Sequence, residues 1–259
     1  MSVSSKRLRA ACVMVAVLVA LSTRAVADAQ TGETLAQPLS TLAGISYVET
    51  VTGGAAQDAE LPMLLALHYM GGSPDSSIAD YGDVEVPLRL LSLAGPHEFR
   101  NGYSWFTPGY YELDSNDQRT ETFAVAERIA EFIREALERY PTHGAPLLTG
   151  YSQGADLTHV IALREPELIA AGLPMGGRFP TAWHDERQTP APLPQEIVLF
   201  HGAADEAVDV AESLAAARYY TAQGVNVTLH TYADVGHAYP ARMKADYEAA
   251  VRRLLRSPE

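Results

Sequence analysis

The residues of this chain best suited to chemistry form a pentapeptide, Gly-Tyr-Ser-Gln-Gly, at positions 150–154. An apolar run at residues 145–149 precedes it, and a segment of helix-forming composition, residues 155–164, follows it. A sharp turn from a strand into a helix exposes a central serine hydroxyl, and the turn needs flanking residues without bulk, as glycines are. The pattern predicts that Ser152 is a nucleophile.

The pentapeptide alone is weak evidence, because chance gives it in roughly one chain in ten of this length. A serine nucleophile also needs a base and an acid, so the residues that could fill these roles decide the prediction. Residues 196–200 are typical of a buried strand and lead to Asp205, while residues 227–232 form a second predicted strand that leads to His237. Side chains at the ends of neighbouring strands can converge. We therefore predict His237 as the base and Asp205 as the acid that orients it.

Other acids and histidines are rivals for these two roles. The alternative acids are Glu206, Asp209 and Asp234, the last only if the final loop folds back. His201 precedes a glycine at a strand end, and we interpret it as a residue that organises its loop by hydrogen bonds. His230, inside a predicted strand, and His159, on the helix after Ser152, are interpreted as structural.

Acyl transfer also needs two N–H groups that stabilise the oxyanion. One belongs to the residue after the nucleophile, Gln153. The second is expected in the loop after an early strand, residues 64–67, where glycines let the backbone approach a substrate. We place that donor at Met70, with Gly71 as the near rival, and we also expect Gly71 to line the substrate pocket.

Two loops are expected to shape a substrate pocket. Residues 102–111 hold five aromatic side chains and follow a predicted strand at residues 88–93. Trp105 and Phe106 are therefore predicted to line a groove, although a well-packed structural loop is the equal alternative. Residues 175–179 follow another predicted strand, and Arg178 is a candidate for the opposite wall.

The remaining pattern alternates strands with helices. Residues 45–52 are predicted as an edge strand, residues 61–67 and 88–93 as buried strands, and residues 122–140 as an amphipathic helix. Such alternation favours an α/β fold with a mostly parallel central sheet, helices on both faces and no large lid. We expect one catalytic domain at residues 44–259, after a flexible leader at residues 28–43.

The first 27 residues are typical of a secretory signal peptide. Basic residues precede an apolar run at residues 10–21, and Ala25-Val26-Ala27 forms a cleavage site. The run would span only ~18 Å as a helix, too short for a bilayer core of ~30 Å. We expect a secreted or periplasmic protein without stable membrane insertion. Cleavage also removes Cys12, the only cysteine, so cysteine nucleophiles and cysteine-bound metals are excluded.

The charge balance is strongly acidic. The chain has a net charge of −13, from 19 Lys and Arg against 32 Asp and Glu. Cleavage after Ala27 removes four basic residues and no acid, which leaves a net charge of −17. Such a charge opposes binding to nucleic acids and to anionic membranes and favours neutral substrates, or it only keeps the protein soluble. The sequence does not predict an oligomeric state.

Several segments resemble the phospholipase/carboxylesterase group of α/β-hydrolases, which includes acyl-protein thioesterases. The similarity extends over about residues 61–255 and rests on residues 67–72, 150–154, 201–208 and 236–237. It implies the α/β-hydrolase fold, no cofactor and no metal, and a triad of Ser152, Asp205 and His237. It also implies an oxyanion hole at the backbone amides of Met70 and Gln153. Short to medium acyl esters, lysophospholipids or acyl thioesters are the implied substrates.

The chain departs from that family at two positions in these motifs. Tyr69 stands where the family usually has glycine, so we expect its ring to narrow the acyl groove, and Asp209 stands where the family usually has proline. Export and the aromatic loop suggest a feruloyl-type or polyester-depolymerase-like esterase as an alternative. A non-catalytic binding protein of the same fold is the alternative from a different class.

Overall fold

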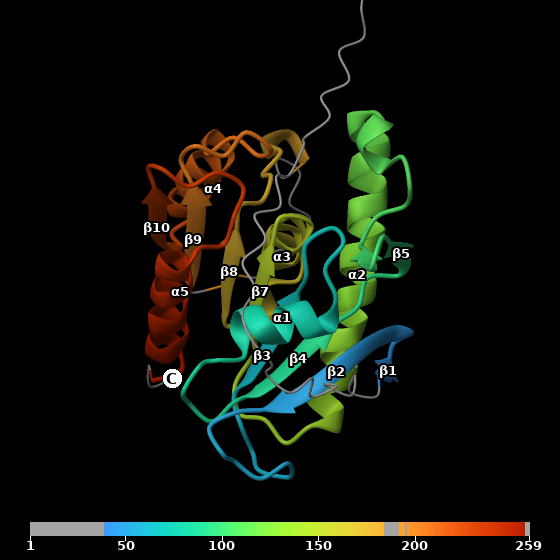
Figure 1. The fold of residues 1–259 in the computed structure, drawn as a ribbon, viewed down its shortest axis with the longest axis vertical. Coiled ribbons are helices and arrows are strands. Elements are labelled where there is room, and N and C mark those ends of the chain that lie inside the picture. The colour runs from blue at the N-terminus through green and yellow to red at the C-terminus, as the bar shows by residue number, and fades with distance from the viewer. Residues whose placement is uncertain (1–38, 184–191, 195, 257–259) are drawn as a thin grey trace, which may run out of the picture. The chain divides into compact units, whose positions relative to one another are not determined.

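A computed structural model of the chain describes residues 39–183, 192–194 and 196–256 (Figure 1). The predicted signal peptide and most of the predicted leader lie outside the described residues. So does His184, for which the sequence indicated no role.

One central sheet organises the described residues. Its eight strands run in the order β1-β2-β4-β3-β7-β8-β9-β10. The pairs β1–β2 and β2–β4 are antiparallel, and every other neighbouring pair is parallel. The bounds are β1 Ser40–Leu42, β2 Ile45–Val51, β3 Met63–Leu67, β4 Arg89–Leu93, β7 Leu147–Tyr151, β8 Ala171–Met175, β9 Glu196–Gly202 and β10 Asn226–Tyr232. The predicted, mostly parallel sheet is confirmed.

Helices cover both faces of this sheet (Figure 1), as predicted. The core on one face is built with α2 (Ser115–Arg139), α3 (Gln153–Arg164) and α4 (Ala211–Ala222). The core on the other face is built with α1 (Pro74–Tyr81) and α5 (Ala241–Leu254). A parallel sheet has to be covered on both sides because its strands are apolar on both, as the fully buried β3 and β4 show.

The folded domain begins before residue 44, the predicted boundary. Ala43 and Gly44 both have positive φ angles, 46° and 71°, and turn the chain back so that β1 pairs with the start of β2. Strand β1 is therefore the edge of the sheet, and the strand predicted as an edge, now β2, lies one position inside.

The amphipathic helix α2 also starts earlier than predicted. The Asp114 carboxylate accepts hydrogen bonds from the N–H groups of Asn116 and Asp117, at 2.9 and 3.0 Å, and so caps the first turn. The apolar stripe that predicted the helix begins later, so the cap rather than the hydrophobic pattern sets its first residue.

Three segments between β4 and α2 form an insertion at the carboxyl edge of the sheet. Strands β5 (His97–Phe99) and β6 (Gly102–Ser104) make a small hairpin, and a single 3₁₀ turn, η1 (Tyr110–Glu112), follows it. The loop after β3 is held to this hairpin because the Gly71 N–H donates to the Tyr103 carbonyl at 2.7 Å. The loops after β7, β9 and β10 open at the same edge, because these strands are parallel.

Candidate active site

Ser152 occupies a strained bend between β7 and α3. Its φ and ψ angles are 55° and −116°, outside the regions that side-chain-bearing residues favour. The flanking glycines leave no room for a side chain. A Cβ on Gly150 would lie 2.3 Å from the backbone of Gly154, and one on Gly154 would lie 2.2 Å from the Leu67 carbonyl oxygen. The predicted strand, turn and helix around Ser152 are thus present.

A chain of hydrogen bonds runs from this serine to a buried carboxylate. The Ser152 Oγ lies 3.0 Å from His237 Nε2, and His237 Nδ1 lies 2.6 Å from Asp205 Oδ2. The contacts are consistent with Oγ–H donating to Nε2 and Nδ1–H donating to the carboxylate. The structure therefore brings together the three residues that the sequence singled out, and it does so at the ends of β7, β9 and β10.

Asp205 is fixed by the backbone as well as by the imidazole. Its Oδ1 accepts the N–H groups of Ala207 and Val208, both at 2.9 Å, and its side chain is 1% exposed. Burial raises the pKa of this carboxyl, but the hydrogen bonds from Val208, His237 and Ala207 outweigh burial. The net pKa lies below the ordinary value, so the group is an anion that can stabilise an imidazolium.

His201 supports the loop of this acid. It is fully buried, its Nε2–H donates to the Val208 carbonyl at 2.8 Å, and its Nδ1 accepts from the Ser213 hydroxyl at 2.7 Å. Its Nε2 is also 3.5 Å from Asp205 Oδ2. The interpretation of His201 as an organiser of its loop agrees with these contacts.

The rival acids Asp209 and Asp234 and the histidines His230 and His159 are engaged elsewhere. Asp209 accepts the N–H of Ala211 near the start of α4, and Asp234 forms an ion pair with Arg242. The His230 ring stacks on Phe200, 5.1 Å between centroids, and His159 is buried beside Tyr220. None of these side chains is recorded in contact with Ser152 within the described part of the chain.

The two backbone N–H groups predicted to stabilise an oxyanion have no backbone acceptor in the part of the chain that the structure describes. Among the described residues, those of Met70 and Gln153 donate to no backbone carbonyl, whereas the Gly71 N–H is used by Tyr103. Gly71, the rival donor and a predicted pocket residue, is therefore tied to the hairpin. Its φ of 86° is the conformation that lets the loop turn there.

His68 holds the loop that carries Met70. Its Nδ1–H donates to the Tyr69 carbonyl at 2.7 Å, and its Nε2 accepts the Gly95 N–H at 2.9 Å. Burial lowers the pKa of this imidazole from 6.5 to about 4, against a smaller opposing effect of the Tyr69 hydrogen bond. His68 is therefore neutral near pH 7 and joins β3 to the end of β4. Sequence reasoning missed this role.

Trp105 and Phe106 are buried side chains, and Trp105 also lines a cavity that contains none of Ser152, Asp205 and His237. Each is 1% exposed and belongs to the core. The Trp105 indole stacks on His68, 4.9 Å between centroids, and donates its N–H to the His68 carbonyl. The insertion packs their rings inward against the sheet and its helices, which agrees with the structural alternative for these two residues.

Arg178 contacts several side chains around the loop that follows β8. Its guanidinium donates to Asp156 Oδ2 from Nε and Nη2, at 2.9 and 2.7 Å, and to Gln118 Oε1 and the Tyr110 hydroxyl. It ties α2, α3 and η1 together. Arg178 is thus a structural support of the wall after β8, and its place in a substrate pocket stays a prediction.

Tyr69 lies on the histidine side of the site. Its ring meets Tyr151 edge-on at 5.8 Å, and Tyr151 stacks on the His237 imidazole at 5.0 Å. Gly176 makes space for this pair, since a Cβ there would lie 3.1 Å from Tyr151 and 3.6 Å from His237.

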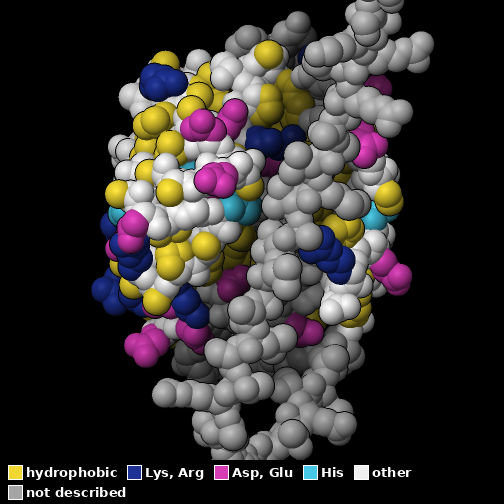
Figure 2. Space-filling view, turned by 45° about the horizontal axis from the view of Figure 1, so that its top comes forward, with side chains coloured by type: hydrophobic (Ala, Val, Ile, Leu, Met, Phe, Trp, Pro, Cys, Tyr) yellow, Lys and Arg dark blue, Asp and Glu magenta, His cyan; other side chains and the backbone are white. Residues whose placement is uncertain are grey.

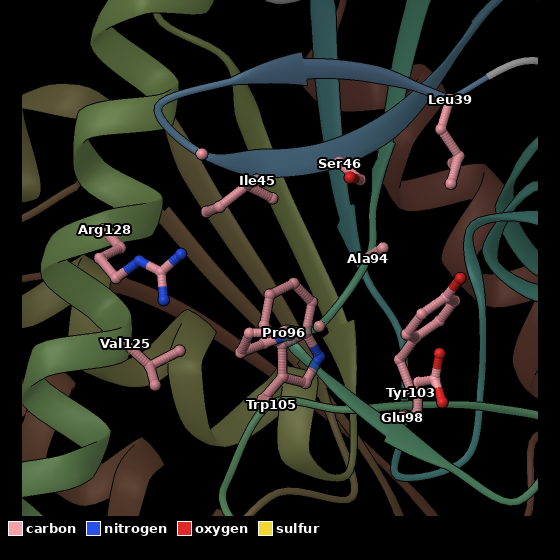
Figure 3. A pocket seen from close by; sticks show the side chains of 12 residues that line it. Leu39, Ile45, Ser46, Ala94, Pro96, Glu98, Tyr103, Trp105, Val125 and Arg128 are labelled. Atoms are coloured by element: carbon pink, nitrogen blue, oxygen red, sulfur yellow. The ribbon is translucent and has the colours of Figure 1, made fainter.

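One cavity among the described residues is separate from this site. It has a volume of about 410 Å³ and lies between β2, the end of β4, α2 and the hairpin (Figure 3). Arg128 and Val125 of α2 and Ile45 of β2 project toward Trp105 and Pro96. None of the three hydrogen-bonded residues lines it. Figure 2 shows hydrophobic, acidic and histidine side chains exposed together on the face that it presents.

Comparisons with solved structures define the fold. An esterase named PE8 superimposes with a TM-score of 0.70 and 22% identity, over 82% of this chain and 99% of that one. A carboxylesterase from Bacillus cereus gives a TM-score of 0.68 and 18% identity, over 81% and 94%. The fold is therefore that of the α/β-hydrolases.

The family follows from the sequence comparison. The phospholipase/carboxylesterase family model matches residues 54–252, so the chain belongs to that family and is a carboxylic ester hydrolase of the serine type. It is also 27% identical over 187 residues to the esterase YpfH of Escherichia coli strain K12, which covers 70% of this chain and 77% of that protein. Within the described residues, no helix has the length and apolar character needed to cross a membrane.

Proposed function

We propose that this hydrolase is exported and cleaves carboxylic esters with short to medium acyl chains through a triad of Ser152, His237 and Asp205. The observation that carries the proposal is the unbroken set of hydrogen bonds from the Ser152 hydroxyl through His237 to Asp205. Export rests on the predicted signal peptide, and a mature N-terminus that follows Ala27 in the exported protein is the expected result.

In the first half-reaction, Ser152 Oγ attacks the ester carbonyl while His237 Nε2 takes its proton. The carbonyl oxygen becomes an oxyanion, which the N–H groups of Met70 and Gln153 stabilise. His237 then returns the proton to the alcohol oxygen as the bond to the acyl carbon breaks. Asp205 keeps the imidazole oriented and stabilises its charged form. The products are a free alcohol and an acyl-Ser152 ester.

In the second half-reaction, water attacks the acyl carbon with His237 again as the base. The acid is released and the serine hydroxyl is restored. No step needs a metal or a cofactor, because the serine supplies the nucleophile, the imidazole moves the proton and the backbone amides stabilise the developing charge.

The experiment is a comparison of wild type with Ser152→Ala on a panel of p-nitrophenyl esters from short to long acyl chains. We expect kcat to fall by roughly 10⁴ or more while the far-UV spectrum and the melting temperature are retained. A fluorophosphonate probe is expected to label wild type and not the variant. Ser46→Ala, which removes a hydroxyl from β2, is the matched control and is expected to be labelled and active.

Two outcomes separate the alternatives. Full activity of Ser152→Ala would rule out this nucleophile, and a folded wild type that neither reacts with the probe nor hydrolyses any ester would favour the binding-protein alternative. A lysophospholipid and a feruloyl ester, assayed beside the panel, test the lysophospholipase and feruloyl-type alternatives directly.

A further inference from the structure

Tyr111 is an exposed aromatic residue that the structure nevertheless holds in place. It belongs to η1, is 50% exposed and is one of the few large apolar side chains at the surface of the described residues. Three contacts fix its ring and hydroxyl. The Tyr110 ring meets it edge-on at 5.1 Å, the Arg178 guanidinium carbon lies 5.1 Å from its centroid, and Gln153 Nε2–H donates to its hydroxyl at 3.2 Å.

The partners of Tyr111 are fixed in turn. Tyr110 is buried, stacks on Phe106 at 4.0 Å and shares a hydrogen bond of 2.7 Å with the Thr122 hydroxyl. Arg178 is anchored by both carboxylate oxygens of Asp156, one through its backbone N–H and one through its guanidinium. A ring held this way loses little conformational freedom when a ligand covers it, so binding at its exposed face costs little entropy.

Gln153 places this ring beside the reacting centre. Its side-chain carbonyl accepts the N–H of Trp105 at 3.1 Å, and its side-chain amide donates to the Tyr111 hydroxyl. The backbone N–H of the same residue is the proposed oxyanion donor. The Gln153 side chain therefore connects the exposed ring to the residue whose backbone N–H would contact the substrate carbonyl oxygen.

The two faces of the sheet separate the alcohol from the acyl group. His237 must reach the alcohol oxygen, and it stacks on Tyr151, which packs with the core of the α1 and α5 face. Tyr110, on which Tyr111 rests, belongs to the core of the α2 and α3 face. Tyr111 thus lies on the other side of Ser152 from the leaving group, where the acyl portion of an ester extends.

We propose that Tyr111 is the platform on which the acyl group of the substrate stacks, and that it favours acids with a flat, unsaturated or aromatic ring close to the carbonyl. The inference rests on the proposed ester hydrolysis by Ser152 and adds to it a substrate class and a specificity-determining residue. Because the Tyr111 hydroxyl accepts a hydrogen bond from Gln153, its own hydrogen remains available to a polar group on such a ring.

The test compares kcat/KM for p-nitrophenyl cinnamate with that for p-nitrophenyl hexanoate, two esters with the same leaving group. Replacement Tyr111→Leu keeps an apolar side chain and removes the ring. We expect the cinnamate-to-hexanoate ratio to fall by about 2- to 13-fold, the range that ring–ring contacts support. In Tyr111→Phe the ratio is expected to stay within about twofold of wild type, because the ring remains.

Leu113→Ala is the matched control, since it removes another exposed apolar side chain from the same loop. An unchanged ratio in Tyr111→Leu, or an equal fall in Leu113→Ala, would overturn the platform. A second series uses esters of one acid with different aryl and alkyl alcohols. If Tyr111→Leu changes kcat/KM only in this series, the ring lies beside the leaving group and the platform proposal is wrong.

The platform and the proposed function fail in different ways. If wild type is labelled at Ser152 and hydrolyses the hexanoate, but the ratio does not depend on residue 111, then only the platform is wrong. If the folded wild type hydrolyses neither ester and is not labelled, both are wrong. Melting temperatures of the variants show whether a change in the ratio arises in a folded protein.

Discussion

Acid should weaken this protein through His68, a residue that takes no part in the proposed chemistry. Between its folded pKa of about 4 and its ordinary value of 6.5, the folded state binds fewer protons at His68 than the unfolded state does. Stability therefore rises with pH in this window and is lost as pH falls through it. Protonation would also put an N–H at Nε2, which now accepts the Gly95 N–H, so two donors would face each other.

The magnitude follows from the two pKa values. One unit of pKa difference between the folded and unfolded states corresponds to about 1.4 kcal/mol of stability. The shift of the His68 pKa from 6.5 to about 4 therefore changes the free energy of unfolding by about 3 kcal/mol in total. Between about pH 7 and about pH 4.5, the contribution of His68 to the free energy of unfolding is expected to fall by about 2.5 kcal/mol. That is a large part of the 5–15 kcal/mol typical of a folded domain.

The assay is urea unfolding of wild type and His68→Asn at several pH values across that range. The asparagine amide also offers both a donor group and an acceptor group but does not titrate. We expect the variant to be less stable near pH 7 and the difference from wild type to shrink by about 2.5 kcal/mol at the acid end. The lowered pKa of Asp205 places its own loss of stability below pH 3.8, outside this window.

The comparison with the variant removes contributions from all other groups. Parallel curves for wild type and His68→Asn would refute the reasoning, because they would mean that His68 binds protons equally in the folded and unfolded states. Since His68 joins the Met70 loop to the end of β4, activity near the acid end is expected to fall with, or before, the loss of fold.

Two further predictions test the site. His237→Ala is expected to lower kcat by roughly 10⁴ with little change in melting temperature. His201→Ala is expected to lower the melting temperature but to keep a much higher kcat than His237→Ala. A lower kcat in His201→Ala than in His237→Ala would exchange the roles of the two histidines. Gly154→Ala is expected to cost about 1–3 kcal/mol in urea unfolding, because its Cβ would lie 2.2 Å from the Leu67 carbonyl oxygen; unaltered stability would mean that the bend has spare room.

The sequence located the three hydrogen-bonded residues because topology leaves little choice. Ser152, Asp205 and His237 each follow a strand of a parallel sheet, and the ends of such strands share one edge, so the strand pattern alone brings them near one another. Their catalytic roles stay predictions until the variants are measured. The start of α1 also has a local sequence signal, since Ser73 caps the helix and Pro74 is its first residue.

The environment of the aromatic loop was beyond local sequence information. Whether Trp105 faces a groove or the core depends on how the insertion folds back on β3 and β4, and composition does not encode that. The adjacency of Tyr110 and Tyr111 shows the same limit. In the 3₁₀ turn η1 successive side chains point in different directions, so one ring is buried while its neighbour is exposed. His68 was missed because its burial is set by residues distant in the chain.

The backbone conformation of Ser152 has a consequence for how this protein would lose activity. A non-glycine residue in such a conformation costs of the order of 1–3 kcal/mol, and it persists only while its surroundings over-determine it. The backbone strain at Ser152 therefore persists only while β7 and α3 hold the bend in place. We expect mild heating, or a destabilising substitution elsewhere in the domain, to relax the backbone at Ser152 before the rest of the domain unfolds. The hydroxyl would turn away from its imidazole while most of the protein still looked native.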